Sequence, residues 1–295
     1  MLLKKHALAW ALAALLPTLP FTTTLADNAH LKGVGFATPE AMEYEADSDT
    51  YLVANINGSP FEKDDNGFIS KLSPDGEVIE LKWLDGASDD ITLNAPKGMV
   101  TQDGKLYVAD IDRLRVFDLS SKKQLDDIVF PGSSFINGVS PAPDGGLYVT
   151  DSGMAPGFKP SGTEAIYKVD AGGKVIKLKS GKLGHPNGVY AKGDTLWMVT
   201  LGSGQLRTMT LDGTETSRMT LPFNRLDGLI VTNDNRLITS SWKAKGVYEI
   251  TPDDHLELIV GELESPADLG YDSKRNRLLI PLFLKDEVVI YSLED

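Results

Sequence analysis

The chain of 295 residues contains no cysteine, so no disulfide can hold its fold and no thiol can act in catalysis or bind a metal. Basic residues are outnumbered, with 29 Lys and Arg against 42 Asp and Glu and a formal net charge of −13. Such an acidic chain disfavours nucleic acid and anionic membranes as partners. After residue 26, no segment is apolar over a length that could cross a bilayer. No sustained helical period of apolar residues is present either, so we expect an all-β fold.

The first 26 residues resemble a secretory signal peptide. Lys4 and Lys5 provide a positive start, and the ten apolar residues 7–16 that follow are too few to span a bilayer. The segment Thr24–Ala26 places small residues at positions −3 and −1 of a cleavage site. We expect cleavage after Ala26 and a periplasmic or secreted protein, whose formal net charge falls to −15 because two lysines and no acid are lost. An uncleaved membrane anchor is the alternative.

A short unit recurs along the rest of the chain, made of a polar leading residue, an apolar run, a polar turn and a second apolar run. In its clearest copy, Pro186-Asn187-Gly188-Val189 is followed by the turn 192–194 and by the apolar residues 196–199. The leading residues of successive units are 40 to 57 residues apart. They are Glu40, Lys97, Asn137, Asn187, Asp227 and Asp268.

Repeats of roughly 40–50 residues made of short strands and turns are typical of β-propeller blades. Six leading residues predict a six-bladed β-propeller with four-stranded blades, in one domain that covers residues 27–295. A propeller usually closes its ring by completing the last blade with a strand from the other end of the chain. We expect residues 31–36 to supply this strand and to pair with residues 287–291.

Two stretches are long for blade turns and contain several Gly and Pro residues. They are residues 57–67 in the first blade and 152–164 in the third. Residues 57–67 would form either a lid over one end of the ring or a mobile surface loop. Around them, residues 51–54, 68–72 and 78–81 are expected as strands of the first blade.

Because the inner strand of every blade faces one tunnel, the leading residues should converge although they are far apart in sequence. Four of them carry oxygens that suit a hard cation: Glu40, Asn137, Asn187 and Asp227. Two carboxylates and two amide oxygens fit Ca²⁺, whereas Zn²⁺ prefers His or Cys. Two other interpretations stay open. Asn-Gly and Asp-Gly pairs also form hairpin turns, and polar side chains on inner strands can simply bond to the tunnel backbone.

The ordered series Pro39-Glu40, Asn137-Gly138-Val139, Pro186-Asn187-Gly188-Val189 and Asp227-Gly228-Leu229 resembles the SMP-30/gluconolactonase/LRE-like family, which includes regucalcin-type lactonases. The likeness covers essentially the whole chain after residue 26. It implies that Glu40, Asn137, Asn187 and Asp227 bind one divalent cation, most often Ca²⁺. It also implies that Asp227 serves as the catalytic base or nucleophile of a hydrolase acting on a lactone or small ester.

The chain departs from the regucalcin-type pattern in one place. Those members carry an arginine just before the third-blade asparagine, where it contacts a sugar-acid lactone. Here residues 133–136 are Ser, Ser, Phe and Ile. The departure puts a sugar lactone in doubt as the substrate.

Four further residues are candidates for substrate contact. Lys97 could meet an anionic substrate or offset nearby carboxylates, or be solvated or ion-paired. His185 could relay protons or pack at the tunnel rim. Trp242 could line the pocket mouth or pack within a blade, and Asp268 completes the ring of leading residues.

The sequence leaves three functions open. The first is an exported, calcium-dependent hydrolase with a small-molecule lactone or ester substrate. The second is a non-catalytic propeller with structural calcium, whose long loops 57–67 and 152–164 bind a ligand or a protein, since a fold does not determine a function. The third is lyase or synthase chemistry on the same scaffold. The resemblance favours the first.

Overall fold

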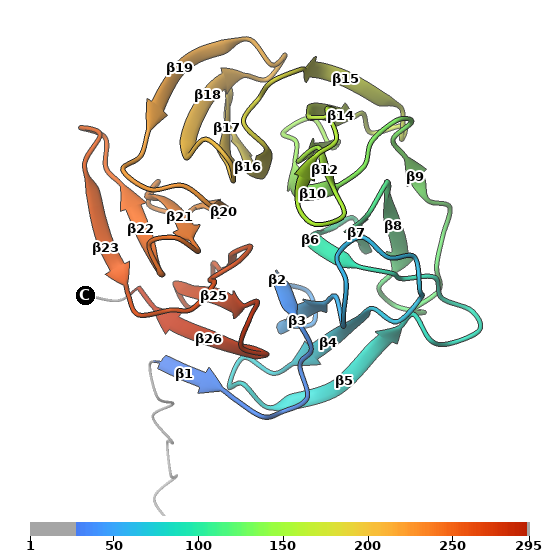
Figure 1. The fold of residues 1–295 in the computed structure, drawn as a ribbon. Coiled ribbons are helices and arrows are strands. Elements are labelled where there is room, and N and C mark those ends of the chain that lie inside the picture. Colours follow the sequence, from blue (N-terminus) through green and yellow to red (C-terminus); the bar gives the residue numbers. More distant parts are fainter. Residues whose placement is uncertain (1–27, 294–295) are drawn as a thin grey trace, which may run out of the picture.

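The computed structural model describes residues 28–293, and the predicted signal peptide, residues 1–26, lies outside this range. Six four-stranded antiparallel sheets are arranged around one axis as the blades of a propeller (Figure 1). The described chain contains strands and turns without any helix, so none is present there that could cross a membrane. The predictions of an all-β fold and of six blades are both confirmed.

The first five blades follow the chain from the innermost to the outermost strand. The first contains β2 (Pro39–Glu45), β3 (Thr50–Asn55), β4 (Phe68–Leu72) and β5 (Val78–Asp85), and the second β6 (Pro96–Gln102), β7 (Lys105–Asp110), β8 (Arg113–Asp118) and β9 (Ile128–Val129). The third contains β10 (Ile136–Pro141), β11 (Leu147–Asp151), β14 (Ala165–Val169) and β15 (Val175–Ser180). The fourth contains β16 (Pro186–Lys192), β17 (Thr195–Thr200), β18 (Gln205–Thr210) and β19 (Glu215–Thr220). The fifth contains β20 (Leu226–Val231), β21 (Leu237–Ser241), β22 (Gly246–Ile250) and β23 (Leu256–Val260).

The sixth blade joins the two ends of the described chain. It consists of β24 (Gly270–Asp272), β25 (Arg277–Leu282) and β26 (Glu287–Ser292), with β1 (Asn28–Leu31) as the outermost strand. Closure by an N-terminal strand is therefore confirmed, but the predicted segment 31–36 is wrong, because residues 28–31 pair with residues 288–291. Gly33 and Gly35 have positive φ angles, so the chain turns away from the sheet directly after β1.

The hydrophobic core lies between neighbouring blades. Leu52 and Ile69 of the first blade belong to one buried cluster with Leu106 and Phe117 of the second. Across the closure, Leu31 belongs to a cluster that joins the first and sixth blades. Each blade is therefore stabilised by both of its neighbours, and the ring depends on being closed.

A β-bulge at the start of each inner strand places the leading residues. In blades one to five, the first residue of the inner strand pairs with the second strand, and the register then shifts at the leading residue. The following glycine is required, because a Cβ at Gly98, Gly138 or Gly188 would come within 2.4 to 2.6 Å of the carbonyl oxygen of the next leading residue. The Asn-Gly and Asp-Gly pairs are thus bulges in inner strands, and their interpretation as hairpin turns is wrong.

The sixth blade shifts this pattern by one residue. Pro266 pairs with Leu282, so Ala267 takes the place of a leading residue and Asp268 takes the place of the glycine. The backbone N–H of Asp268 donates to the Glu40 carbonyl at 2.9 Å, which joins the sixth blade to the first. The assignment of Asp268 as the sixth leading residue is therefore corrected.

Candidate active site

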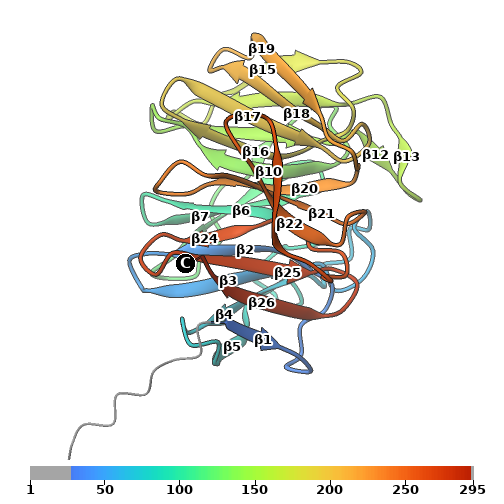
Figure 2. The ribbon, with the colours of Figure 1, turned by 90° about the vertical axis from the view of Figure 1, so that its left-hand side faces the viewer.

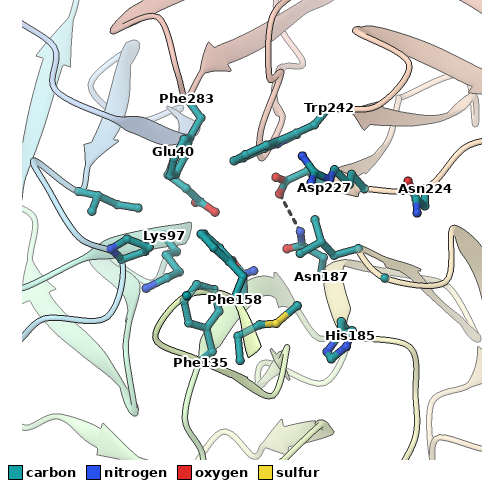
Figure 3. Close-up of a pocket in the computed structure, with 18 residues that line it drawn as sticks. Glu40, Lys97, Phe135, Phe158, His185, Asn187, Asn224, Asp227, Trp242 and Phe283 are labelled. Atoms are coloured by element: carbon teal, nitrogen blue, oxygen red, sulfur yellow. Dashed lines mark hydrogen bonds between the residues drawn. The ribbon is translucent and has the colours of Figure 1, made fainter. Parts of the chain in front are cut away.

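A cavity of about 490 Å³ opens at the end of the tunnel where the inner strands begin (Figure 3). Its volume is in the range of small-molecule sites. It is lined by all four predicted metal ligands and three of the four predicted substrate contacts, namely Glu40, Asn137, Asn187, Asp227, Lys97, His185 and Trp242. Asp268 lies elsewhere: it lines a second cavity of about 440 Å³ at the other end of the inner strands, together with Glu43.

Two buried carboxyl groups reach the first cavity from opposite sides (Figure 3). Burial raises the pKa of Glu40 well above its ordinary value, the nearby Asp227 and Asp268 raise it further, and Lys97 opposes the shift. Burial and Asp268 likewise raise the pKa of Asp227. The Glu40 Oε2 atom is buried and accepts no hydrogen bond from residues 28–293. Two buried acids with an unpaired oxygen fit a cation.

The two asparagines present their carbonyl oxygens because other groups hold their amide nitrogens. Asn137 Nδ2 donates to Ser152 Oγ at 3.0 Å. Asn187 Nδ2 donates to Asp227 Oδ1 at 3.0 Å and to the Leu226 carbonyl at 3.3 Å. These contacts assign the amide orientation, and no donor in the described chain bonds to either Oδ1 atom. Both amide oxygens are therefore available to a metal.

The donor chemistry at this mouth fits a hard cation. In residues 28–293, no three His, Asp or Glu side chains gather as a metal cluster of the kind that zinc prefers. The candidate set instead combines Glu40 and Asp227 with the amide oxygens of Asn137 and Asn187, which is a set of oxygen donors only.

Lys97 is fixed in the wall of the cavity, with 1% of its surface exposed. Its Nζ atom donates to the Ala95 carbonyl at 2.9 Å and lies 4.5 Å from the ring centre of Phe135. Burial lowers the pKa of Lys97 to about 8, against the opposing effect of Asp110 and Glu40. The alternative of a solvated lysine is thus excluded, and the ammonium group offsets part of the carboxylate charge.

His185 and Trp242 also line the cavity. The His185 Nδ1 atom is 2.9 Å from the Ser152 carbonyl oxygen, and because a carbonyl can only accept, Nδ1 carries the hydrogen. A neutral ring then leaves Nε2 as an acceptor. Trp242 packs against Phe283 with ring centres 4.7 Å apart and the ring planes tilted by 43°. Its indole nitrogen lies beside Asp227 and opposes the rise in the pKa of this carboxyl group. The two groups do not form a hydrogen bond.

Three buried acids that the sequence analysis missed hold the turns that lead into the inner strands. Glu164 Oε2 accepts the backbone N–H groups of residues 183, 184 and 185 at 2.7, 2.7 and 3.0 Å. Asp110 accepts those of residues 94 and 95, and Asp151 those of residues 134 and 135. The repeated pattern Leu-Tyr-Val-x-Asp at residues 106–110 and 147–151 is a sequence signal for the two aspartates. Glu164 has no such signal.

Glu164→Ala should lower the free energy of unfolding by roughly 2–4 kcal/mol, because it leaves three N–H groups without their acceptor in a largely buried turn. Glu164→Gln keeps one acceptor oxygen and should cost clearly less. Urea denaturation of both variants and the unchanged chain measures the difference. Equal losses in the two variants would contradict the role of Glu164 as an acceptor for the turn before Asn187.

Both long loops lie over this cavity. Pro60 from residues 57–67 lines it, as do Met154, Gly157 and Phe158 from residues 152–164. The second loop forms a small hairpin of β12 (Met154–Ala155) and β13 (Lys159–Pro160), which projects from one face of the ring, on the right in Figure 2. Of the two interpretations of residues 57–67, their placement supports the lid.

Comparison with known proteins identifies the family of the chain. The model of the SMP-30/gluconolactonase/LRE-like region matches residues 69–268, and the chain belongs to this family. Its structure is similar to a gluconolactonase from Xanthomonas campestris, with 18% identity, 90% of each chain covered and a TM-score of 0.68. It is also similar to a luciferin-regenerating enzyme, with 13% identity, coverage of 90% of this chain and 96% of that chain, and a TM-score of 0.66.

A third similar structure is a virginiamycin B lyase from Staphylococcus aureus, with 14% identity, 90% of this chain and 99% of that chain covered, and a TM-score of 0.61. In sequence, no curated protein matches the chain. These three similar proteins are named for different reactions. At these identities the likeness establishes the propeller fold, and the activity has to be argued from the site.

Proposed function

We propose that the chain is an exported, calcium-dependent hydrolase that opens a lactone or cleaves a small ester. One observation carries the proposal: two buried carboxyl groups, one with an unpaired oxygen, share a cavity with two amide oxygens that no protein group bonds. Membership of a family that includes gluconolactonases supports the lactonase class. The export part rests on residues 1–26, and sequencing the N-terminus of the mature protein tests it, with Asp27 expected as its first residue.

Glu40, Asn137, Asn187 and Asp227 would hold one Ca²⁺ through oxygen atoms. When bound, the ion would polarise the substrate carbonyl and stabilise the negative charge that develops on its oxygen. Side chains of the cavity would carry out the remaining steps.

Asp227 is the candidate base. Asn187 holds its Oδ1 atom at 3.0 Å, which orients the carboxyl group and leaves the second oxygen to take a proton from an attacking water. The Lys97 ammonium group, fixed by Ala95, balances part of the negative charge around the reacting carbonyl. The packed rings of Trp242 and Phe283 cover one side of the site and limit access of bulk water.

Calcium should stabilise the mature chain and support its turnover. At a concentration 100 times the dissociation constant, the ion adds about 2.7 kcal/mol, which should raise Tm by roughly 5–10 °C. Thermal melts with calcium or with a chelator measure this shift. Assays of a panel of lactones and aryl esters under the same conditions should show turnover that the chelator abolishes.

The two readouts separate the proposed functions. A calcium-dependent rise in Tm without turnover of any lactone or ester would favour a non-catalytic propeller with structural calcium. Turnover that is insensitive to the chelator, or a Tm that no divalent ion changes, would contradict the proposed metal site.

A further inference from the structure

Away from the four oxygen ligands, the walls of the active-site cavity are largely apolar. They are formed by Ile56, Phe135, Met154, Phe158, Trp242 and Phe283. Among the polar side chains that also line the cavity, Lys97 is already held by Ala95 and Phe135, and Asn224 and Arg225 are exposed at the rim. The Nε2 atom of His185 and the Nε1 atom of Trp242 stay available to a ligand. A ligand that enters this cavity therefore meets few groups that could replace the water around a hydroxyl.

Three aromatic rings, which we call the aromatic cap, meet at the mouth of the cavity: Phe61, Phe135 and Phe158. The ring centres of Phe61 and Phe135 are 5.0 Å apart, and those of Phe61 and Phe158 are 5.1 Å apart. Phe61 and Phe158 come from the two long loops, whereas Phe135 directly precedes β10. The cap thus joins loops of two blades over one cavity. Figure 3 shows two of its rings, those of Phe135 and Phe158, with Phe158 near the centre of the view.

Phe158 is placed there at a conformational cost. It lies at the tip of the β12–β13 hairpin with a φ of +57°, in the left-handed region that bulky side chains rarely adopt. The residue is also 49% exposed, so burial within the protein recovers only part of that cost. Strained positions of this kind concentrate at ligand-binding sites. An exposed, strained ring at the mouth of a cavity points to contact with a ligand.

We propose that the aromatic cap makes the enzyme selective for lactones or esters that carry an apolar chain or aryl group, with Phe158 as the specificity-determining residue. This inference rests on the proposed hydrolase function. With the reacting carbonyl beside Asp227, the apolar group lies between the cap and the Trp242–Phe283 pair. A polyhydroxylated sugar lactone would lose hydration at several hydroxyls and find too few polar groups in the cavity to replace it.

A series of γ-lactones with no side chain and with linear chains of two, four and six carbons tests the selectivity. For the unchanged protein, kcat/KM should rise by about fourfold for each CH₂ that the cavity buries. Gluconolactone should be at least about 100-fold poorer than the best alkyl lactone, since several hydroxyls lose their hydration. A preference for gluconolactone would overturn the inference.

Two variants of Phe158 separate specificity from stability. Asn and Gly both tolerate the left-handed backbone, so Phe158→Asn and Phe158→Gly should keep or raise Tm. The ratio of kcat/KM for the longest and the unsubstituted lactone should fall by about tenfold or more, through a higher KM for the long chain. Ile79→Ala on the outermost strand β5 removes another exposed apolar side chain and should leave that ratio unchanged. An unchanged ratio in both Phe158 variants would overturn the role of this residue.

Binding can be measured without turnover. 2-Alkylcyclopentanones present a ring carbonyl and an apolar chain but cannot be hydrolysed. Their shift of Tm should grow with chain length for the unchanged protein and shrink in Phe158→Asn. If this holds while no lactone or ester is turned over, the hydrolase proposal fails and the apolar selectivity of the cavity stands. If no ketone binds, or if chain length has no effect, the selectivity itself is wrong.

Discussion

Asp227→Asn should reduce turnover of the best lactone or ester by roughly 10²–10⁴-fold while the propeller stays folded. The amide cannot take a proton from water and is a weaker ligand for calcium, so the calcium-induced rise in Tm should shrink as well. In the absence of calcium, Tm should stay the same or rise. Burial and Asp268 already raise the pKa of Asp227, which means that the fold disfavours its charged form. The Asn187 Nδ2 group can still donate to the new amide oxygen.

Asp268→Asn is the matched control for this variant. It makes the same chemical change at another carboxyl of the tunnel, one that lines the second cavity rather than the first. We expect it to keep most of the turnover and the full calcium response. Full activity in Asp227→Asn, or equal losses in the two variants, would contradict the assignment of Asp227.

Deleting residues 27–31 should abolish the cooperative unfolding transition or lower Tm by more than about 10 °C. The deletion removes β1 and its pairing with four residues of β26, together with the buried Leu31 side chain and the hydrogen bond between His30 and Glu287 at 2.7 Å. It also opens the ring, so the first and sixth blades lose a contact that both need. Calorimetry of the shortened chain measures the loss.

Replacing Lys32 and Val34 with Ser, while Gly33 and Gly35 keep their positive φ angles, is the control for the deletion. Both replaced residues are exposed and lie outside the strand, so the melting curve should change little. If the replacement were as damaging as the deletion, the strand would extend beyond Leu31 as the sequence first suggested. A shortened chain that melts like the intact one would contradict closure by β1.

The repeat made both the fold and the metal ligands predictable. Glu40, Asn137, Asn187 and Asp227 occupy the same place in the bulge of their blades, so the spacing that reveals the blades also identifies the residues that meet on the axis. The glycine after each asparagine and aspartate follows from the close approach of the next blade. These features repeat because each blade packs against the next one in the same way.

What does not repeat was harder to predict. Asp268 is displaced by one residue, and only the pairing of Pro266 with Leu282 reveals that Ala267 holds the equivalent place. Leu31 could end a strand, as it does here, or begin the predicted strand 31–36. The turn after Leu31 depends on the conformations of Gly33 and Gly35. No periodic signal marks these choices in the sequence.

The aromatic cap and the Glu164 contacts could not be predicted from the sequence either. Phe61 and Phe158 lie in irregular loops and meet only because both loops fold over the same mouth. Glu164 acts through three backbone groups about twenty residues away, which no side-chain pattern encodes. Contacts of this kind follow from tertiary structure rather than from local preference.

A crystal structure of residues 27–295 grown with calcium tests the metal site most directly. We expect one ion at the first cavity, with oxygen atoms of Glu40, Asn137, Asn187 and Asp227 at about 2.3–2.6 Å. The absence of an ion at these residues at saturating calcium, or an ion bound only in the second cavity beside Glu43 and Asp268, would contradict the proposed site and the hydrolase mechanism built on it.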